Sequence, residues 1–348
     1  MAAPRLSAQV EIDAGARIFA DGLLLDLVAA LQRTASGELV ALVSSESTAI
    51  ERDLEAWSRF TGHAIVARTV EGGRTRWVIR HGAVAESDAA ERPLGERLWL
   101  YVNFDCNLQC DYCCVRSSPT SARRALGIEA VRRIAAEAPP LGVRTFLVTG
   151  GEPFLLPDVD EIVLALAAAA PVTLLTNGML FKGARRAALT RLPRERVTLQ
   201  ISLDSPTADL HDAHRGAGAW RRAVEGIEIA RAEGFRVRLA ATVATDDDER
   251  AFRAFLDTLD VPTDDRVVRR VALRGFATKG VALGRADLVP EITITTNGVY
   301  WHPVGAEDDD LMVTEAIFPL ADAFAAVRRT AAGERTHRDR LASIYYCA

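Results

Sequence analysis

The chain of 348 residues has few cysteines, no long apolar run and no block of like charge. Its five cysteines give no sign of a disulfide framework. The net charge of -5 is dispersed, so neither nucleic acid nor an anionic membrane is an expected partner. The longest apolar run, around 162–172, is too short to span a bilayer, and residues 1–13 lack an apolar signal core. We therefore expect a cytoplasmic protein with room for two domains.

Three of the cysteines lie in one short segment. Cys106, Cys110 and Cys113 form a C-x3-C-x2-C triplet, and Tyr112 directly precedes the third. Three thiolates on one loop can hold three irons of a 4Fe-4S cube and leave the fourth iron open to a small molecule. The alternatives are a zinc loop or ordinary buried thiols. Structural zinc usually takes four closed ligands, and no second cysteine pair or nearby histidine supplies the rest, so the pattern favours the cluster.

Polar residues follow three apolar runs downstream of the triplet. The run 145–149 leads into Gly150, Gly151 and Glu152, where paired glycines let the backbone approach a ligand closely. The next two runs, 172–176 and 197–203, end at Asn177 and Asp204. Active sites of parallel barrels collect at such strand ends. A simple turn, a helix cap or a surface ion pair is the alternative for each residue taken singly.

In this order, the motifs resemble those of the radical S-adenosylmethionine (SAM) enzymes, from about Arg97 to Arg285. In that family the cysteines carry the cluster, SAM chelates the open iron, and an electron from the cluster cleaves SAM to a 5'-deoxyadenosyl radical. Cys114 lies beyond the family's pattern, and we expect a packed thiol there. The resemblance implies a set of SAM contacts: Tyr112 near the adenine, Gly150, Gly151 and Glu152 at the amino group with Glu152 as acceptor, Ser202 and Asp204 near the ribose, and Arg215 of the segment 209–216 facing the carboxylate. Asn177, at a strand end, is added to this cofactor-binding set.

Residues 1–83 alternate strand and helix patterns in the order βαβαββ, which predicts a small two-layer α+β domain. The segment resembles the TusA-like sulfur carriers through residues 21–23, 36–38, 57 and 61–63. Where that family has its sulfur-carrying cysteine and a proline, this chain has Leu25 and Asp26. Because leucine cannot form a persulfide, we expect a scaffold for dimerisation, partner docking or covering the barrel mouth rather than a sulfur carrier.

Residues 84–96 read as a linker, and 97–285 as the radical SAM core. About six strand and helix units predict an α/β fold with a partial (β/α)6 TIM-type barrel. Residues 286–348 resemble a degenerate SPASM or twitch-like extension, in which relatives carry cysteines for auxiliary clusters. At the matching place this chain has Trp301, His302 and Pro303, and only Cys347 remains, so we predict one 4Fe-4S cluster per chain.

The missing auxiliary cysteines favour a reaction without net oxidation, such as decarboxylation, epimerisation or dehydration, of lyase or isomerase type. The expected substrate is a small natural-product intermediate, sugar- or nucleoside-like, and the expected reductant is a flavodoxin or ferredoxin. His302 is a candidate acid or base, with a capping or surface role as the alternative. Cys347 is a candidate hydrogen donor, with a packed or exposed thiol as the alternative. The alternatives are modification of a ribosomal peptide and, from another class, a non-catalytic iron-sulfur or sulfur-relay scaffold.

Overall fold

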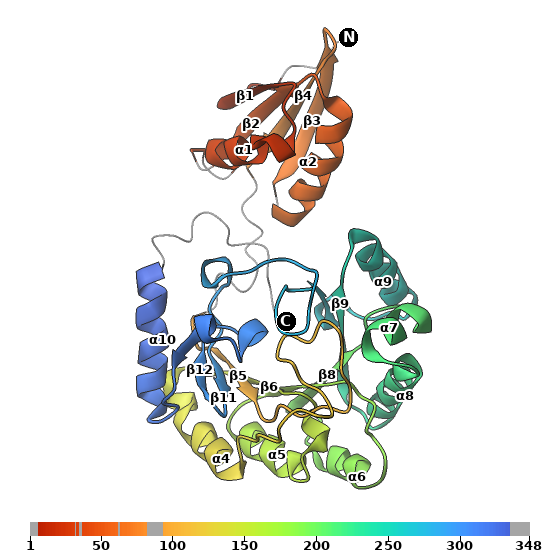
Figure 1. The fold of residues 1–348 in the computed structure, drawn as a ribbon, viewed down its shortest axis with the longest axis vertical. Coiled ribbons are helices and arrows are strands. Elements are labelled where there is room, and N and C mark those ends of the chain that lie inside the picture. The colour runs from red at the N-terminus through yellow and green to blue at the C-terminus, as the bar shows by residue number, and fades with distance from the viewer. Residues whose placement is uncertain (1–5, 32, 35–36, 62, 82–92, 335–348) are drawn as a thin grey trace. The chain divides into compact units, whose positions relative to one another are not determined.

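The computed structural model describes residues 6–31, 33–34, 37–61, 63–81 and 93–334, which fall into two compact units (Figure 1). Residues up to 81 form the N-terminal unit, and residues from 93 form the barrel unit. Most of the linker predicted at 84–96 lies outside the described residues, as does Cys347. No helix in the described ranges is long and apolar enough to cross a membrane.

The N-terminal unit is a four-stranded sheet with two helices. Its elements are β1 (Val10–Gly15), α1 (Leu23–Leu31), β2 (Leu39–Ser44), α2 (Ser47–Thr61), β3 (Ala64–Glu71) and β4 (Arg74–Arg80). The strands lie in the order β1-β2-β4-β3, with β1 and β2 parallel and the other pairs antiparallel. This confirms the predicted βαβαββ order.

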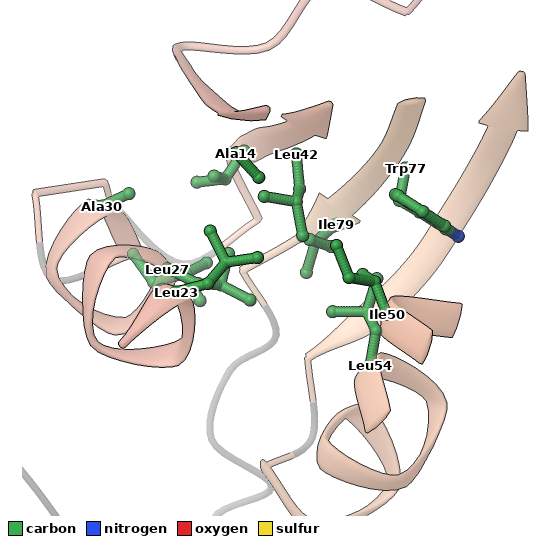
Figure 2. Close-up of a cluster of buried hydrophobic side chains, with 11 residues drawn as sticks. Ala14, Leu23, Leu27, Ala30, Leu42, Ile50, Leu54, Trp77 and Ile79 are labelled. Carbon is green, nitrogen blue, oxygen red and sulfur yellow. The ribbon is translucent and has the colours of Figure 1, made fainter. Parts of the chain in front are cut away.

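The core of the N-terminal unit lies between its helices and its sheet. Leu23 and Leu27 from α1 lie toward Leu42 and Ile79 of the sheet, and Leu54 from α2 lies beside Ile50 (Figure 2). Helical spacing in α1 places Leu23 and Leu27 on one side, and the intervening Leu25 stays 73% exposed. The position that resembles the sulfur-carrier site is therefore a surface leucine.

The barrel unit is built on six parallel strands. They are β5 (Arg97–Tyr101), β6 (Thr145–Thr149), β7 (Val172–Thr176), β8 (Val197–Ser202), β9 (Arg236–Val243) and β10 (Arg266–Arg270), paired in that order. The helices between them are α4 (Ile128–Glu137), α5 (Val159–Ala169), α6 (Gly183–Arg191), α7 (Ala208–Arg215), α8 (Ala219–Ala232) and α9 (Asp246–Thr258). The predicted partial (β/α)6 barrel is confirmed.

Residues after the sixth strand extend the same sheet. The strand β11 (Thr293–Thr295) pairs in parallel with β5, and β12 (Gly298–Tyr300) and β13 (Met312–Thr314) continue the sheet antiparallel. The helix α10 (Leu320–Glu334) follows. The segment predicted as an extension thus joins the barrel sheet at its β5 edge.

Candidate cofactor site at the strand ends

The three predicted ligand cysteines lie on the long loop between β5 and α4. Backbone N–H groups point at two of the sulfurs: Leu108 donates to Cys106 Sγ and Ser117 to Cys113 Sγ, each at 3.4 Å. Such bonds stabilise anionic sulfur and tune iron-sulfur clusters. Burial raises the pKa of Cys106, and the nearby Glu152, Cys110 and Cys113 raise it further. The three thiols are therefore close enough to influence one another, and as an anionic set they need the charge of a metal.

The donor set fits a cluster better than a single metal ion. Among the described residues, no three His, Cys, Asp or Glu side chains converge where one ion could bind. A zinc site requires four ligands at one point, whereas a cube takes each thiolate on a different iron. Cys114 packs against a buried group that includes Tyr101 and Phe104, as expected for a packed thiol.

Glu152 joins the ends of β6 and β7. Its Oε1 accepts hydrogen bonds from the Phe154 N–H (3.0 Å) and the Thr176 hydroxyl (2.8 Å), and its Oε2 accepts from the Asn177 N–H (2.8 Å). The side chain is 0% exposed, and burial raises its pKa above the usual range. Glu152 positions two strand ends here, and its direct contact with the SAM amino group stays a prediction.

Gly150 and Gly151 allow a close approach within the chain itself. A Cβ at Gly150 would lie 2.2 Å from Asn103 Oδ1, and one at Gly151 would lie 2.2 Å from the Asp105 carbonyl oxygen. The Gly151 N–H also donates to the Asn103 carbonyl at 3.1 Å. On the side where a Cβ would point, the segment leading into the cysteine loop fills the space, and the predicted contact of these glycines with a ligand stays a prediction.

Asp204 is the centre of a second buried network. It accepts hydrogen bonds from the Tyr112 hydroxyl, from Arg215 Nε at 2.5 Å and from the Thr242 N–H at 3.0 Å. Burial alone would raise the pKa of Asp204, but Arg215 holds it below the usual value. The Arg215 guanidinium also lies 5.6 Å from the centroid of the Tyr112 ring. In this structure Arg215 faces Asp204, so its contact with the SAM carboxylate stays a prediction.

Asn177 connects the end of β7 to the cysteine loop. Its Nδ2 donates to Asn107 Oδ1 at 2.8 Å, and its Oδ1 accepts from the Met179 N–H at 3.0 Å. Ser202, half-buried at the end of β8, lies two residues before Asp204. The predicted residues on β6, β7 and β8 are thus brought to the same edge of the sheet as the cysteines.

His302 lies just after β12 and is 1% exposed. Its Nδ1 accepts a hydrogen bond from the Val304 N–H at 3.1 Å, which caps a short turn. Burial, together with neighbouring arginines such as Arg269, lowers the pKa of His302 to about 3. The ring is neutral near neutral pH, and this geometry favours the capping interpretation over the acid-base role.

The segment after β10 is anchored on the cysteine loop. Gly275 adopts a φ of 64°, and a Cβ there would lie 2.1 Å from the Cys113 carbonyl oxygen. The next residue, Phe276, donates its N–H to the same oxygen at 2.9 Å. Beside this contact a cavity of about 910 Å³ is lined by residues that include Arg274, Asp308 and Asp310. The loop that carries the thiols is therefore held by the segment after β10 as well as by Asn177 at the end of β7.

Sequence reasoning missed three residues that hold the site together. Asn103 donates to the Glu152 carbonyl at 2.9 Å, Thr176 binds the Glu152 carboxylate, and Thr242 supports Asp204 through its backbone. Asn103 and Thr176 are polar residues at the ends of apolar runs, a signal that could have identified them. Thr242 acts through its N–H, which every non-proline residue carries, so no side-chain pattern could reveal it.

Comparison with known proteins places part of the chain in a known family. Residues 100–259 match the model of the radical SAM superfamily, so the chain contains a radical SAM domain. A 4Fe-4S cluster and SAM are the cofactors characteristic of this family. The cysteine loop and the networks around Glu152 and Asp204 lie within the matched range.

Three curated relatives illustrate the breadth of the family. A probable GTP 3',8-cyclase of Aeropyrum pernix is 34% identical over 44% of this chain and 44% of that protein. The antilisterial bacteriocin subtilosin biosynthesis protein AlbA of Bacillus subtilis is 31% identical, with coverages of 47% and 36%. An AdoMet-dependent heme synthase of Methanosarcina barkeri is 31% identical, with coverages of 43% and 43%. The chain spans less than half the length of these relatives.

A solved structure shares the fold. Native anSMEcpe with bound AdoMet superposes with a TM-score of 0.52 at 13% identity, covering 68% of this chain and 82% of that chain. At this identity the likeness supports the barrel architecture and nothing finer.

Proposed function

We propose that the protein is a radical SAM enzyme with one 4Fe-4S cluster on Cys106, Cys110 and Cys113. It cleaves SAM reductively and takes a hydrogen atom from a small natural-product intermediate, sugar- or nucleoside-like, in a reaction without net oxidation. Decarboxylation, epimerisation and dehydration are the candidate outcomes, of lyase or isomerase type. The observation that carries the proposal is the cysteine triplet on one loop, with backbone N–H groups aimed at two of its sulfurs, beside buried polar networks at the barrel strand ends.

The chain's own residues would prepare this site in three ways. When bound, the cluster and SAM supply the radical that removes the hydrogen atom. Cys106, Cys110 and Cys113 hold the metal, and the N–H groups aimed at two of the sulfurs stabilise their charge. Glu152 and Asp204 fix the strand ends through several donors each, so the site is ordered before any ligand arrives.

The preference for a reaction without net oxidation comes from the segment after the barrel. In oxidising relatives an auxiliary cluster can accept an electron from the product radical. Here Trp301 and His302 occupy the place of the auxiliary cysteine, and both side chains are buried in the protein's own packing. An electron that stays with the substrate or returns to the cofactor suits elimination or epimerisation. A flavodoxin or ferredoxin would supply the priming electron.

Modification of a ribosomal peptide is the second candidate, favoured by the similarity to the bacteriocin biosynthesis protein AlbA. A non-catalytic iron-sulfur or sulfur-relay scaffold is the candidate from another class. Sulfur relay through the N-terminal unit has no support from Leu25, because no thiol stands at that position. We propose that this unit serves instead for docking, for dimerisation or to cover the barrel mouth.

Anaerobic reconstitution tests the enzyme proposal. The protein should take up about four irons per chain and, on reduction with SAM present, release 5'-deoxyadenosine. If neither occurs, the enzyme proposal fails. A scaffold would keep its partner affinity in Cys106→Ala. Transfer of deuterium into 5'-deoxyadenosine from labelled sugars or nucleosides, and not from labelled peptides, would support the small-molecule assignment; the reverse result would support the peptide candidate.

A further inference from the structure

The inside of the barrel carries an arginine that the SAM site does not use. Side chains alternate along β10, and Val267 packs with Trp99, Leu147 and Ala240 from β5, β6 and β9. These side chains meet across the barrel, so this side of β10 faces the barrel interior. Arg269 is two residues further along and lies on the same side. It therefore projects from the interior face of the last parallel strand.

The other arginines of β10 are paired on the outer face. Arg266 forms an ion pair with Asp257 of α9, and Arg270 forms ion pairs with Asp246 and Glu249 of the same helix. Arg269 differs from both. Its Nε is buried without a hydrogen-bond partner, and within the described part of the chain no ion pair joins it to a carboxylate.

Two neighbouring polar groups inside the barrel have the same property. The Nε of Arg238 on β9 and the Oε1 of Gln200 on β8 are buried without hydrogen-bond partners among the described residues. Arg238 and Gln200 are paired in the sheet register. Because buried polar groups are normally hydrogen-bonded, the unmet N–H donors of Arg238 and Arg269 on the neighbouring strands β9 and β10 mark a place where an acceptor ligand would complete them, whereas the unmet Gln200 oxygen is itself an acceptor.

The interior has an excess of positive charge. Its glutamate, Glu291, is already used, because one oxygen pairs with Arg97 and the other accepts from Trp99 Nε1 at 3.0 Å. Arg238 and Arg269 remain without such a pair. Burial lowers the pKa of Arg238, and the carboxylate of Asp265 opposes this shift. Arg236, Arg269 and Arg97 lower the pKa further, so the cations near Arg238 outnumber this one carboxylate. An anion would relieve this repulsion.

Arg269 also lies at the level of the cofactor networks. In the sheet register it pairs with Thr242, and the Thr242 N–H supports Asp204 at 3.0 Å. Arg238 lies two strand levels deeper, because it precedes Thr242 by four residues on the same side of β9. A ligand held by Arg269 would therefore sit beside the Asp204 network.

We propose that Arg269 binds an anionic group of the substrate, a carboxylate or a phosphate, inside the barrel, and that Arg238 adds positive charge from below. The inference deepens the proposed function, on which it rests, by assigning an acidic substrate. A guanidinium can bind either group through two parallel hydrogen bonds.

Calorimetry on the anaerobically reconstituted full chain tests the site, with inorganic phosphate and acetate as separate probes. We expect the wild-type protein to bind at least one of them, and the tighter anion indicates which acid group the site takes. Arg269→Gln and Arg269→Ala should each weaken that binding roughly tenfold or more. Arg270→Gln, on the same strand but the outer face, should change it by less than about twofold. No binding to the wild-type protein, or equal weakening in all three variants, would overturn the site.

A labelling experiment on the wild-type protein guards against variants that fail to fold. Phosphate or acetate should slow modification of Arg269 by phenylglyoxal, read by mass spectrometry, without slowing that of Arg270. Equal rates at Arg269 with and without the anion would contradict the proposal. Release of 5'-deoxyadenosine by the wild-type protein is measured separately. If 5'-deoxyadenosine is released while Arg269 shows no anion effect, only this inference fails. If Arg269 binds the anion but no 5'-deoxyadenosine is released, the proposed function fails.

Discussion

Among the described residues, the N-terminal unit and the barrel bury different kinds of side chain. The N-terminal interior is formed by residues such as Leu27, Leu42 and Trp77, and no carboxylate is buried there. The barrel buries Glu152 and Asp204 almost completely. A buried carboxylate is costly unless several donors compensate it, and each of these has at least three. The interior of the N-terminal unit therefore serves stability, whereas the interior of the barrel also positions the candidate cofactor site.

Removing one ligand cysteine should abolish the activity of the barrel unit and leave the N-terminal unit folded. Replacing Cys106 with alanine should remove the cluster and reduce 5'-deoxyadenosine release to background, because two thiolates cannot hold the cube at its three irons. The N-terminal unit should keep its hydrogen-exchange protection. Iron content, product release and exchange resolved by peptide are the measurements. Cys114→Ala is the matched control and should keep its iron; loss of iron in that variant would show that the ligand set is misassigned.

The second prediction concerns the buried pair in the barrel. Asp204→Asn leaves the Arg215 guanidinium, whose side chain is 10% exposed, without its countercharge. The free energy of unfolding of the barrel should fall by about 3–5 kcal/mol. In the control Glu225→Gln, the partner Lys182 is 67% exposed and Glu225 itself 47% exposed, so the loss should be only about 0–1 kcal/mol. Urea unfolding checks both, and equal losses would remove the distinction between buried network and surface pair.

The third prediction tests the apolar interior of the N-terminal unit on one helix. Leu27 is 0% exposed and Leu25 is 73% exposed, although both belong to α1. Leu27→Ala should destabilise this unit by about 2–5 kcal/mol, whereas Leu25→Ala should change its stability by less than about 0.5 kcal/mol. Hydrogen exchange in β2 and β4 gives the measurement. A large loss from Leu25→Ala would show that this exposed position has a packing role.

The fourth prediction uses pH. His302 has a pKa lowered to about 3 by burial, and His211 one lowered to about 4 by burial and Arg215. Both are neutral when folded, while an unfolded histidine has a pKa near 6.5. The unfolded chain therefore binds protons more readily below pH 6.5, and stability is full above that pH and falls as the pH decreases toward 3–4. For His302 the loss is about 1.4 kcal/mol per pH unit.

The N-terminal unit has His63, whose pKa burial also lowers to about 4, but that side chain is only half-buried. Between pH 7.5 and 5 the barrel should therefore lose more stability than the N-terminal unit. Hydrogen exchange at the two pH values measures this, after correction for the intrinsic exchange rate. His302→Gln should flatten the response of the barrel alone. A response that is equal in both units, or unchanged in the variant, would contradict the assignment.

Much of the architecture could be predicted because it depends on local patterns. Alternating strand and helix patterns predicted the βαβαββ order of the N-terminal unit, and about six strand and helix units predicted the barrel. The cysteine spacing led to the radical SAM assignment, which the match over residues 100–259 confirms. The roles of single polar residues were less predictable. The sequence around a carboxylate such as Glu152 is the same whether the carboxylate binds a ligand or accepts hydrogen bonds from three donors of its own chain.

The sequence by itself determined the cysteine triplet, the order of strands and helices, and the leucine at the place of a sulfur-carrier cysteine, because each is written in contiguous residues. Only the tertiary structure decided that Gly150 and Gly151 accommodate the chain itself and that Arg215 faces Asp204. It also decided that Arg269 has no ion pair inside the barrel among the described residues, while Arg266 and Arg270 pair with α9 on the outer face. These facts depend on which groups from distant segments come within a few ångströms of one another, and that is set by the order and register of the strands in the sheet.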